Sequence, residues 1–500
     1  MSRRASSASI LILTAVGLAA CAVGPDYRAP VVLLEPGYLN AGASSVNATP
    51  PGVDIATFWR GFADPTLSQL VERALAANGD VRIAQARLRE SRALLEGTRA
   101  ELLPEVGVNG GVRRSLVPEA QLLGASRDQR TTTLYDAGFT ANWELDFFGR
   151  NRRASESAAA QVEASAAGLA AVGTSIAAEV ARNYLEVRGL QQRKQVVDES
   201  IANQRETLRL TEARLDSGRG TRLDVSRSRS QLESTEATLP AIQAASDRTA
   251  YRLATLTAQS PRAVNEQLAA GPQTLPSLPV TDLGALPIGT PEQLLRRRPD
   301  LLQAERQLAA ATADIGVVTA DLFPRISLTG LIGLAGLNLG SLGGGSSQLY
   351  TLGAGLTWSV LDFGRVRSRI SASEARAQQA LAAYEQSVAV ALEETEGTLT
   401  QFTRNAQRGE RLAAAAADAE DAFRIATLRF HAGSVDFLVV LDAQRQALTT
   451  RDALVQAEIA QATGLVAVYR ALGGGWPQQQ AEIAGSAGLH AAGGRVVSAR

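Results

Sequence analysis

Hydrophobic and polar residues alternate along four short stretches of the chain, which predicts β-strands with one apolar face. In TLGAGLTWSVLDFGR, residues 351–365, leucine, alanine, tryptophan and valine occupy every second position from Leu352 to Val360. A period of two residues is the repeat of a strand. The same alternation begins at Val106, at 135 and at 325. We expect strands of roughly ten residues, the length of a membrane-barrel strand. The large apolar residues that we expect to face lipid are Phe139, Trp143, Leu356 and Trp358.

Long segments without proline follow each pair of strands and predict long helices. From Asn151 to Asp216 the apolar positions are three or four residues apart, which is the spacing of a coiled-coil seam. About sixty residues at ~1.5 Å each make a rod of about 100 Å, which must pack against other helices along its length. The rods end at Gly218 and Gly433, and returning helices begin near Leu223 and Leu438.

The chain contains an internal repeat. Trp143 and Trp358 lie 215 residues apart, and so do the turn glycines Gly218 and Gly433. Three segments match in the same order: 96–110 with 316–330, WELDFFGR with WSVLDFGR, and 212–225 with 427–440. Such ordered matches favour a duplication of a unit of about 200 residues.

Each copy also begins with a helix. The capping residues and the prolines that follow them are Asp64 with Pro65, and Thr290 with Pro291. Gln293 would complete a capping box on Thr290. We expect these helices to reach about Leu103 and Leu322, where Pro104 and Pro324 stop them.

The N-terminus has the layout of a secretory signal. Arg3 and Arg4 precede a short apolar stretch that is too short to span a membrane. The segment LAAC ends at Cys21, the only cysteine, and resembles a bacterial lipobox. In a lipoprotein this thiol carries diacylglycerol and becomes the first residue; the alternative is an ordinary cleavage site with an incidental cysteine. No later segment looks apolar enough for a spanning helix, so a membrane crossing would need a closed barrel of strands.

These features divide the chain into six parts. They are a signal peptide (1–20), a lipidated N-terminal segment (21–63), a first repeat (64–260), a proline-rich linker without periodicity (261–289), a second repeat (290–472) and a tail (473–500). The fold class expected is mainly α, with long coiled-coil helices and four β-strands in each copy of the chain. Four strands cannot close a barrel in lipid, because open edges leave backbone groups unpaired. Three copies can close one of twelve strands.

Composition argues against an enzyme. The 50 basic and 50 acidic residues balance, so no net charge favours nucleic acid. One cysteine, two histidines and no phosphate-loop or nucleophile motif leave little for a metal, a cofactor or a catalytic site. We expect no cofactor and no enzymatic activity.

Several motifs resemble the TolC-like outer-membrane efflux proteins, in particular the lipoprotein branch called the NodT family, which includes OprM. The motifs are CAVGPDYRAP, FWRGFADPTLSQLVERALAANGDV, LLRRRPDLLQAE, the paired W-to-FGR segments, LDAQRQAL and YRALGGGW. The resemblance covers nearly all of the chain from Cys21 to Trp476. It implies a homotrimer in which the four strands of each protomer join into one twelve-stranded barrel in outer-membrane lipid. The helices would form a long coiled-coil helical barrel, a tunnel through the periplasm. The implied partners are a periplasmic adaptor (membrane fusion) protein and an inner-membrane transporter of the RND type, which together export small molecules such as drugs.

The same resemblance implies a gate at the periplasmic tip. It places the pore constriction at Leu438, Asp442 and Arg445, which are spaced to share one helix face. The alternative is that Asp442 and Arg445 are only a solvated ion pair. A second acidic residue of TolC is replaced by Val439, which makes the ring less charged.

The tip turns resemble those that dock an adaptor hairpin, and the residues implied are Gly218, Asp224 and Gly433. Phe430 and Val435 stand where TolC has polar locking partners, which argues against a TolC-style lock. Two other functions stay open. One is the outer-membrane channel of a type I protein secretion system. The other is a lipid-anchored coiled-coil scaffold without a pore, which would not explain the four strands.

Overall fold

The computed structural model describes residues 22–39 and 55–475. Cys21 and the part of the tail from 476 onward therefore lie outside the described residues. Two compact units form, and each contains segments from both repeats. Among the described residues, the first unit holds 22–31, Leu88–Ser165 and Ala304–Tyr384, and the second holds 32–39, 55–87, Ala166–Gln303 and 385–475.

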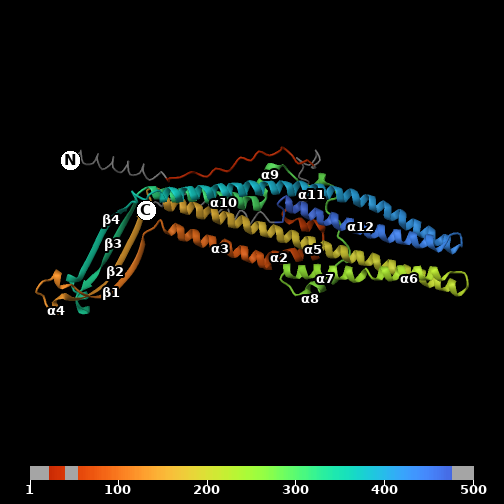
Figure 1. Ribbon diagram of the computed structural model, residues 1–500, viewed down its shortest axis with the longest axis horizontal. Helices are drawn as coiled ribbons and strands as arrows, with labels where there is room; N and C mark the ends of the chain where they lie inside the picture. The colour runs from red at the N-terminus through yellow and green to blue at the C-terminus, as the bar shows by residue number, and fades with distance from the viewer. Residues whose placement is uncertain (1–21, 40–54, 476–500) are drawn as a thin grey trace, which may run out of the picture. The chain divides into compact units, whose positions relative to one another are not determined.

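The first unit contains one antiparallel sheet of four strands in the order β1-β2-β3-β4 (Figure 1). The strands are β1 (Glu105–Leu116), β2 (Thr131–Leu145), β3 (Arg325–Gly336) and β4 (Gln348–Thr357). Two connections carry only short helical turns. These are η2 (Glu119–Gln121) and α4 (Arg127–Arg130) after β1, and η5 (Leu339–Gly343) and η6 (Gly345–Ser347) after β3.

The strand register places the predicted apolar residues on one face of the sheet. Directly opposed residues of an antiparallel pair point to the same side. One row across all four strands is Val108, Phe139, Ile332 and Tyr350, and another row on that face is Leu145, Ile326 and Leu356. The other face carries glycine, serine, threonine and asparagine in rows such as Asn142, Thr329 and Gly353. The alternation in the sequence therefore predicted both faces.

The expectation that the last strand reaches Val360 is wrong, because β4 ends at Thr357. Trp358 lies one residue beyond the strand, and its indole nitrogen donates to the Leu322 carbonyl at 3.0 Å. The chain then turns, because the Asp362 carboxylate accepts from the backbone N–H groups of Gly364 and Val366.

The opening helix of each repeat is broken in two, where one continuous helix was expected. The first consists of α2 (Pro65–Ala77) and α3 (Gly79–Ala100), and the second of α9 (Pro291–Arg297) and α10 (Pro299–Thr319) with the short turn η4 (Ala320–Leu322). Asn78 causes the first break, because its side-chain oxygen caps α3 at the N–H of Asp80, 2.8 Å away. Arg298 precedes Pro299, and a residue before proline is disfavoured in helical conformation. Asp64 and Thr290 cap α2 and α9 as predicted, but at Thr290 only the bond from the Gln293 N–H is formed.

The two long helices match their predictions closely. They are α5 (Arg150–Asp216) and α11 (Arg365–His431). The second repeat returns in one helix, α12 (Phe437–Ala471), whereas the first returns in two, α6 (Arg222–Glu236) and α7 (Leu239–Leu256), the second of which has Pro240 in its first turn. By length and composition α5 also qualifies as a membrane-spanning helix, contrary to expectation. In its most apolar window 44% of the residues are buried, as in a helix that packs against others.

The linker between the repeats is more ordered than its composition suggested. It contains α8 (Pro261–Ala270) and the turn η3 (Leu283–Ala285). Ser260 caps α8 by accepting from the Ala263 N–H, and Val264 and Leu268 are buried. The expectation of a segment without periodicity is therefore wrong for its first ten residues, whose capping serine and following proline were signals of a helix start.

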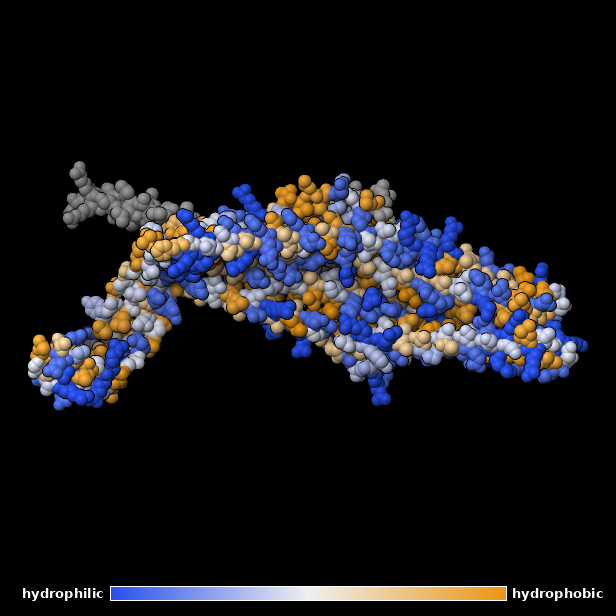
Figure 2. Space-filling model, viewed as in Figure 1, coloured by the Kyte–Doolittle hydropathy of each residue, from blue (hydrophilic) through white to orange (hydrophobic). Residues whose placement is uncertain are grey.

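A group of aromatic side chains is buried in the second unit. The turn η1 (Ile55–Phe62) buries Phe58, Trp59 and Phe62 to 2% exposure each, and the Phe58 ring stacks on Tyr469 at 5.0 Å. On the visible surface of the molecule hydrophobic and polar residues are mixed, and hydrophobic groups occur on the strands and at the helix tips (Figure 2).

Candidate functional site

Two matching turns form the tips of the helical hairpins in the second unit. Gly218 has a φ of +74° and Gly433 a φ of +73°, values that favour glycine. At the first turn the N–H of Arg219 bonds the Arg214 carbonyl, and at the second the N–H of Ser434 bonds the Arg429 carbonyl. A side chain added at either glycine would meet open space. The tips are therefore equivalent in both repeats, and their glycines face no neighbouring atoms of this chain.

The first turns of α12 have one buried face and one exposed stripe. Phe437, Val440 and Leu441 pack with Ala426 of α11 in a small core. Leu438 is 53% exposed, and Asp442 and Arg445 are also exposed. The structure thus brings the three residues implied for the constriction onto one uncovered stripe.

Arg445 does not form an ion pair with Asp442 in the described structure. Its Nε donates instead to Oε1 of Gln231 on α6, at 2.6 Å. The pairing of Asp442 with Arg445 that the alternative supposed is therefore not formed in the described structure. Gln231 is a residue that sequence reasoning missed. Its bond joins the returning helices of the two repeats and leaves the Asp442 carboxylate without a basic partner among the described residues.

A second contact joins the two hairpins at their ends. The Arg214 guanidinium of α5 lies over the Phe430 ring of α11, 4.3 Å from its centroid, and Nη1 also donates to the Phe430 carbonyl. Cations bind the faces of aromatic rings by electrostatic attraction. Asp224 serves α6 itself, because it forms a capping box with Thr221. The spacing of Thr221 and Asp224 was a signal for that box.

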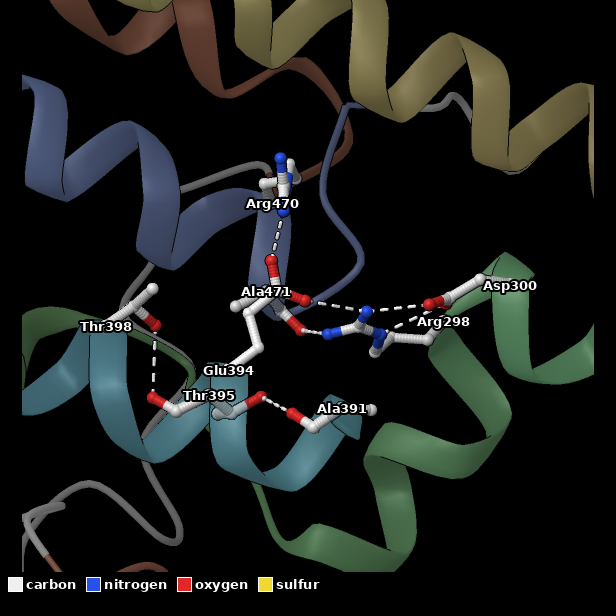
Figure 3. A network of polar contacts seen from close by, with 8 residues as sticks. All are labelled: Arg298, Asp300, Ala391, Glu394, Thr395, Thr398, Arg470 and Ala471. Atoms are coloured by element: carbon white, nitrogen blue, oxygen red, sulfur yellow. Dashed lines mark hydrogen bonds and ion pairs between the residues drawn. The ribbon is translucent and has the colours of Figure 1, made fainter. Parts of the chain in front are cut away.

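A charged cluster fixes the far end of α12. Arg298, at the break between α9 and α10, binds both carboxylate oxygens of Asp300 and donates to the Ala471 carbonyl at 3.2 Å (Figure 3). Its Nη2 also lies 2.9 Å from Glu394 of α11, which in turn binds Arg470 of α12. Burial alone would raise the pKa of Glu394, but the two arginines hold that pKa below its ordinary value.

The N-terminal residues are fastened to the first unit. The N–H of Val23 donates to the Phe148 carbonyl at 3.1 Å, and the buried Arg153 binds the carbonyls of Val23 and Gly24 and, at 2.6 Å, Asp26. Gly24 has no room for a side chain, because a Cβ there would lie 2.4 Å from the Cα of Gly316. The GPDY segment that carried part of the resemblance therefore docks beside the end of β2. Ala22 is the first described residue, so the lipidation of Cys21 stays a prediction.

The described residues contain no candidate metal site. No group of three or more histidine, cysteine, aspartate or glutamate residues within 22–39 and 55–475 could hold a metal ion. What the structure offers is a sheet with one apolar face, two hairpin tips and an exposed stripe of one leucine, one aspartate and one arginine.

Comparison with known proteins decides the family. Residues 70–259 and 290–474 match the outer membrane efflux protein family, one stretch in each repeat. The chain belongs to the outer membrane efflux proteins. The channel is 32% identical to the pyoverdine export outer membrane protein OpmQ of Pseudomonas aeruginosa over 453 residues, which cover 89% of this chain and 92% of OpmQ. It is 30% identical to the cation efflux system protein CusC of Escherichia coli over 476 residues, which cover 93% of this chain and 98% of CusC.

Solved structures agree. The outer-membrane channel OprN superposes with a TM-score of 0.84 at 39% identity, covering 91% of this chain and 100% of OprN. The channel is thus an outer-membrane efflux conduit that extends into the periplasm, and it is not an enzyme. Members of its family are trimeric and work with adaptor and inner-membrane pump components. The predicted family, fold class and efflux function are confirmed.

Proposed function

We propose that three copies of this chain form one gated channel, and that the exposed stripe of α12 is its periplasmic constriction. The observation that carries this proposal is the placement of Leu438, Asp442 and Arg445 on one uncovered face while the opposite face is buried. Around a three-fold axis, Leu438 forms an apolar ring and Asp442 a ring of three carboxylates one turn further along. Such rings close a pore by dewetting and select cations by charge.

The adaptor acts at the tips in this proposal. Gly218 and Gly433 present identical turns with free space around them, as a docking surface for a hairpin requires. Asp224 contributes by holding the start of α6 beside the first turn. Engagement of the tips by the adaptor separates α6 from α12 and opens the ring.

The partners are an adaptor protein and an inner-membrane transporter of the RND type, which delivers small molecules such as drugs. One relative is named for pyoverdine export and another for cation efflux. Because a passive conduit exports what is delivered to it, we infer that the transporter sets the cargo. Acyl chains on Cys21 would hold the N-terminus in the outer membrane, and Phe139, Trp143, Leu356 and Trp358 would face lipid.

Conductance in planar bilayers tests the gate. We expect Asp442→Ala to leak, with a higher resting conductance and greater vancomycin uptake by cells, and with lower preference for potassium over chloride. Asp436→Ala is the matched control, because Asp436 is also exposed but precedes α12 as its N-cap residue, where its side chain forms no capping hydrogen bond. Unchanged conductance, selectivity and uptake in Asp442→Ala would exclude Asp442 from the constriction.

A further inference from the structure

The apolar face of the sheet carries a single charged residue. Along β1 to β4, the face that holds Phe139 and Leu356 consists of apolar residues, glycine, threonine, tyrosine and glutamine, and its one charge is Arg114. The opposite face has five charged residues, namely Glu105, Arg113, Asp136, Glu144 and Arg325. On the lipid side of a barrel strand an arginine is costly at the middle of the membrane and nearly free at its boundary. We therefore expect Arg114 to lie at a membrane boundary.

The length of β2 places Arg114 just outside the apolar band. Arg114 is paired with Thr133, and the next residue of that face toward α5 is Tyr135. Tyr135 and Leu145 are ten residues apart, which is about 33 Å along a strand. When a strand is tilted by about 40°, this length covers about 25 Å of height, the height of the apolar band of an outer-membrane barrel. Tyrosine is also typical of the boundary itself.

The course of the chain identifies this boundary as the outer one. The ends of β2 and β4 at Leu145 and Thr357 lead into the long helices α5 and α11. Arg114 is near the other end of the sheet, next to the connection that carries η2 and α4 (Figure 1). Because the channel extends into the periplasm at its helical end, this connection faces the cell exterior. The outer leaflet of the outer membrane contains phosphorylated glycolipids.

Two further arginines adjoin Arg114 in this connection. Thr131 is on the same face as Arg114, and its hydroxyl donates to the Arg127 carbonyl at 2.8 Å. Arg127 therefore lies just beyond Arg114. The connection is closed at its base by Arg130, whose Nη1 donates to the Val117 carbonyl at 3.2 Å. Nε of Arg130 is buried and has no hydrogen-bond partner among the described residues.

The connection has an excess of positive charge. Residues 113–130 contain four arginines and two acidic residues, a net charge of +2. Of the acidic residues, Glu119 lies 3.9 Å from one of the arginines. Arg114 and Arg127 are exposed and form no ion pair with a described residue. The other connection of the sheet, 337–347, has no charged residue. Each copy of the chain thus presents one positive surface at the outer boundary.

We propose that Arg114 and Arg127 bind the phosphate groups of a glycolipid of the lipopolysaccharide class in the outer leaflet. A guanidinium group binds phosphate through two parallel N–H bonds. Val112 is the next residue of the same face toward the helices and is 66% exposed, so it offers the acyl chains an apolar surface. This inference rests on the proposed lipid-facing position of Phe139 and Trp143, and it adds a specific lipid to that face.

Native mass spectrometry of trimers of the full chain in detergent tests the site by counting bound lipid. The probes are lipid A with two phosphate groups and lipid A from which both have been removed. We expect Arg114→Gln to bind phosphorylated lipid A about fivefold more weakly than the unmutated protein, and Arg114→Gln with Arg127→Gln about 25-fold more weakly, because one basic residue near an anionic lipid contributes about a factor of five. Dephosphorylated lipid A should bind weakly and equally to all of them.

Two variants control for charge and for folding. Arg113→Gln is the matched control, because Arg113 is adjacent and exposed but lies on the opposite face. It should bind phosphorylated lipid A as the unmutated protein does. Arg114→Lys keeps the positive charge and should bind more tightly than Arg114→Gln. An equal loss in Arg113→Gln and Arg114→Gln would indicate diffuse charge attraction and overturn the site.

The remaining outcomes separate this inference from the channel itself. Equal binding by all variants, with normal conductance and efflux, would overturn the lipid site and leave the proposed function standing. A loss in Arg113→Gln alone would overturn the lipid site together with the lipid-facing position of Phe139 and Trp143. Phosphatidylglycerol is the third probe. If it bound as tightly as phosphorylated lipid A and depended on the same arginines, the assignment to an outer-leaflet glycolipid would be rejected.

Discussion

The bond between Arg445 and Gln231 should hold the closed state, and its removal should open the channel. It is the hydrogen bond that joins α12 to α6 near the stripe, at 2.6 Å. Gln231→Ala is the better perturbation, because it removes the acceptor and leaves Leu438, Asp442 and Arg445 in place. A hydrogen bond to a charged group contributes about 1.5–3 kcal/mol when protected, but exposed charged contacts contribute about 0–1 kcal/mol. Both partners here are at the surface, so we take about 0.5–1 kcal/mol per copy.

Three copies multiply this effect if they open together. The closed state would then lose about 1.5–3 kcal/mol, which corresponds to about a 10- to 150-fold change in the ratio of closed to open channels, at about 1.4 kcal/mol per factor of ten. Single-channel recording in planar bilayers measures this ratio directly as the fraction of time that the channel is open.

Two further variants test whether the Arg445–Gln231 bond holds the gate closed. Because one bond is removed in either case, Arg445→Ala combined with Gln231→Ala should open the channel no more than Arg445→Ala alone. Arg424→Ala is the control, since Arg424 bonds Asp421 within α11 and bridges no hairpins. Full additivity of the two changes, or an unchanged open fraction in Gln231→Ala, would show that this bond does not hold the gate.

Two other predictions concern the tips and the charged cluster. Gly218→Trp or Gly433→Trp should abolish efflux in drug-susceptibility assays while native gels still show trimers. Gly218→Ala, with the same backbone strain but little bulk, should retain efflux. Normal resistance in the tryptophan variants would reject docking at the tips. Glu394→Gln should destabilise the protein at pH 7 by about 1–3 kcal/mol, because it weakens charged hydrogen bonds, as measured by thermal unfolding in detergent. Because the pKa of Glu394 is lowered in the folded protein, the carboxylate contributes to stability above the ordinary pKa of 4.5, and this contribution is lost as pH falls through the folded pKa. The unmutated protein should therefore lose more stability below pH 4.5 than Glu394→Gln does. Parallel profiles of stability against pH would contradict this assignment.

Much of the fold follows from local patterns in the sequence. The spacing of apolar residues placed α5 within one residue of its observed start, because a coiled-coil seam has a strong period and a glycine stop. The alternation of strand residues found both faces of the sheet, since a one-residue error would invert every side chain. The helix breaks were missed although signals existed, namely the pair Arg298–Pro299 and the capping asparagine at Asn78.

The partners within the candidate site were harder to find. Gln231 and Arg445 are 214 residues apart, and nothing in either local sequence marks them as a pair. Their contact depends on how α6 packs beside α12, which is a property of tertiary structure. The same holds for Arg214 over Phe430, where the sequence showed only that a polar lock was missing.

The unbroken course of α12 has a mechanical consequence. One end carries the exposed stripe that we propose as the constriction, and the other is held where Arg298 binds the Ala471 carbonyl. A straight helix of this length acts as a lever of ~50 Å, so that each degree of rotation about the anchored end moves the tip by about 1 Å. A pore can thus dilate by several ångströms while the anchor remains intact. The corresponding segment of the first repeat is broken between α6 and α7, and a rotation of α6 can be taken up at this break without moving α7.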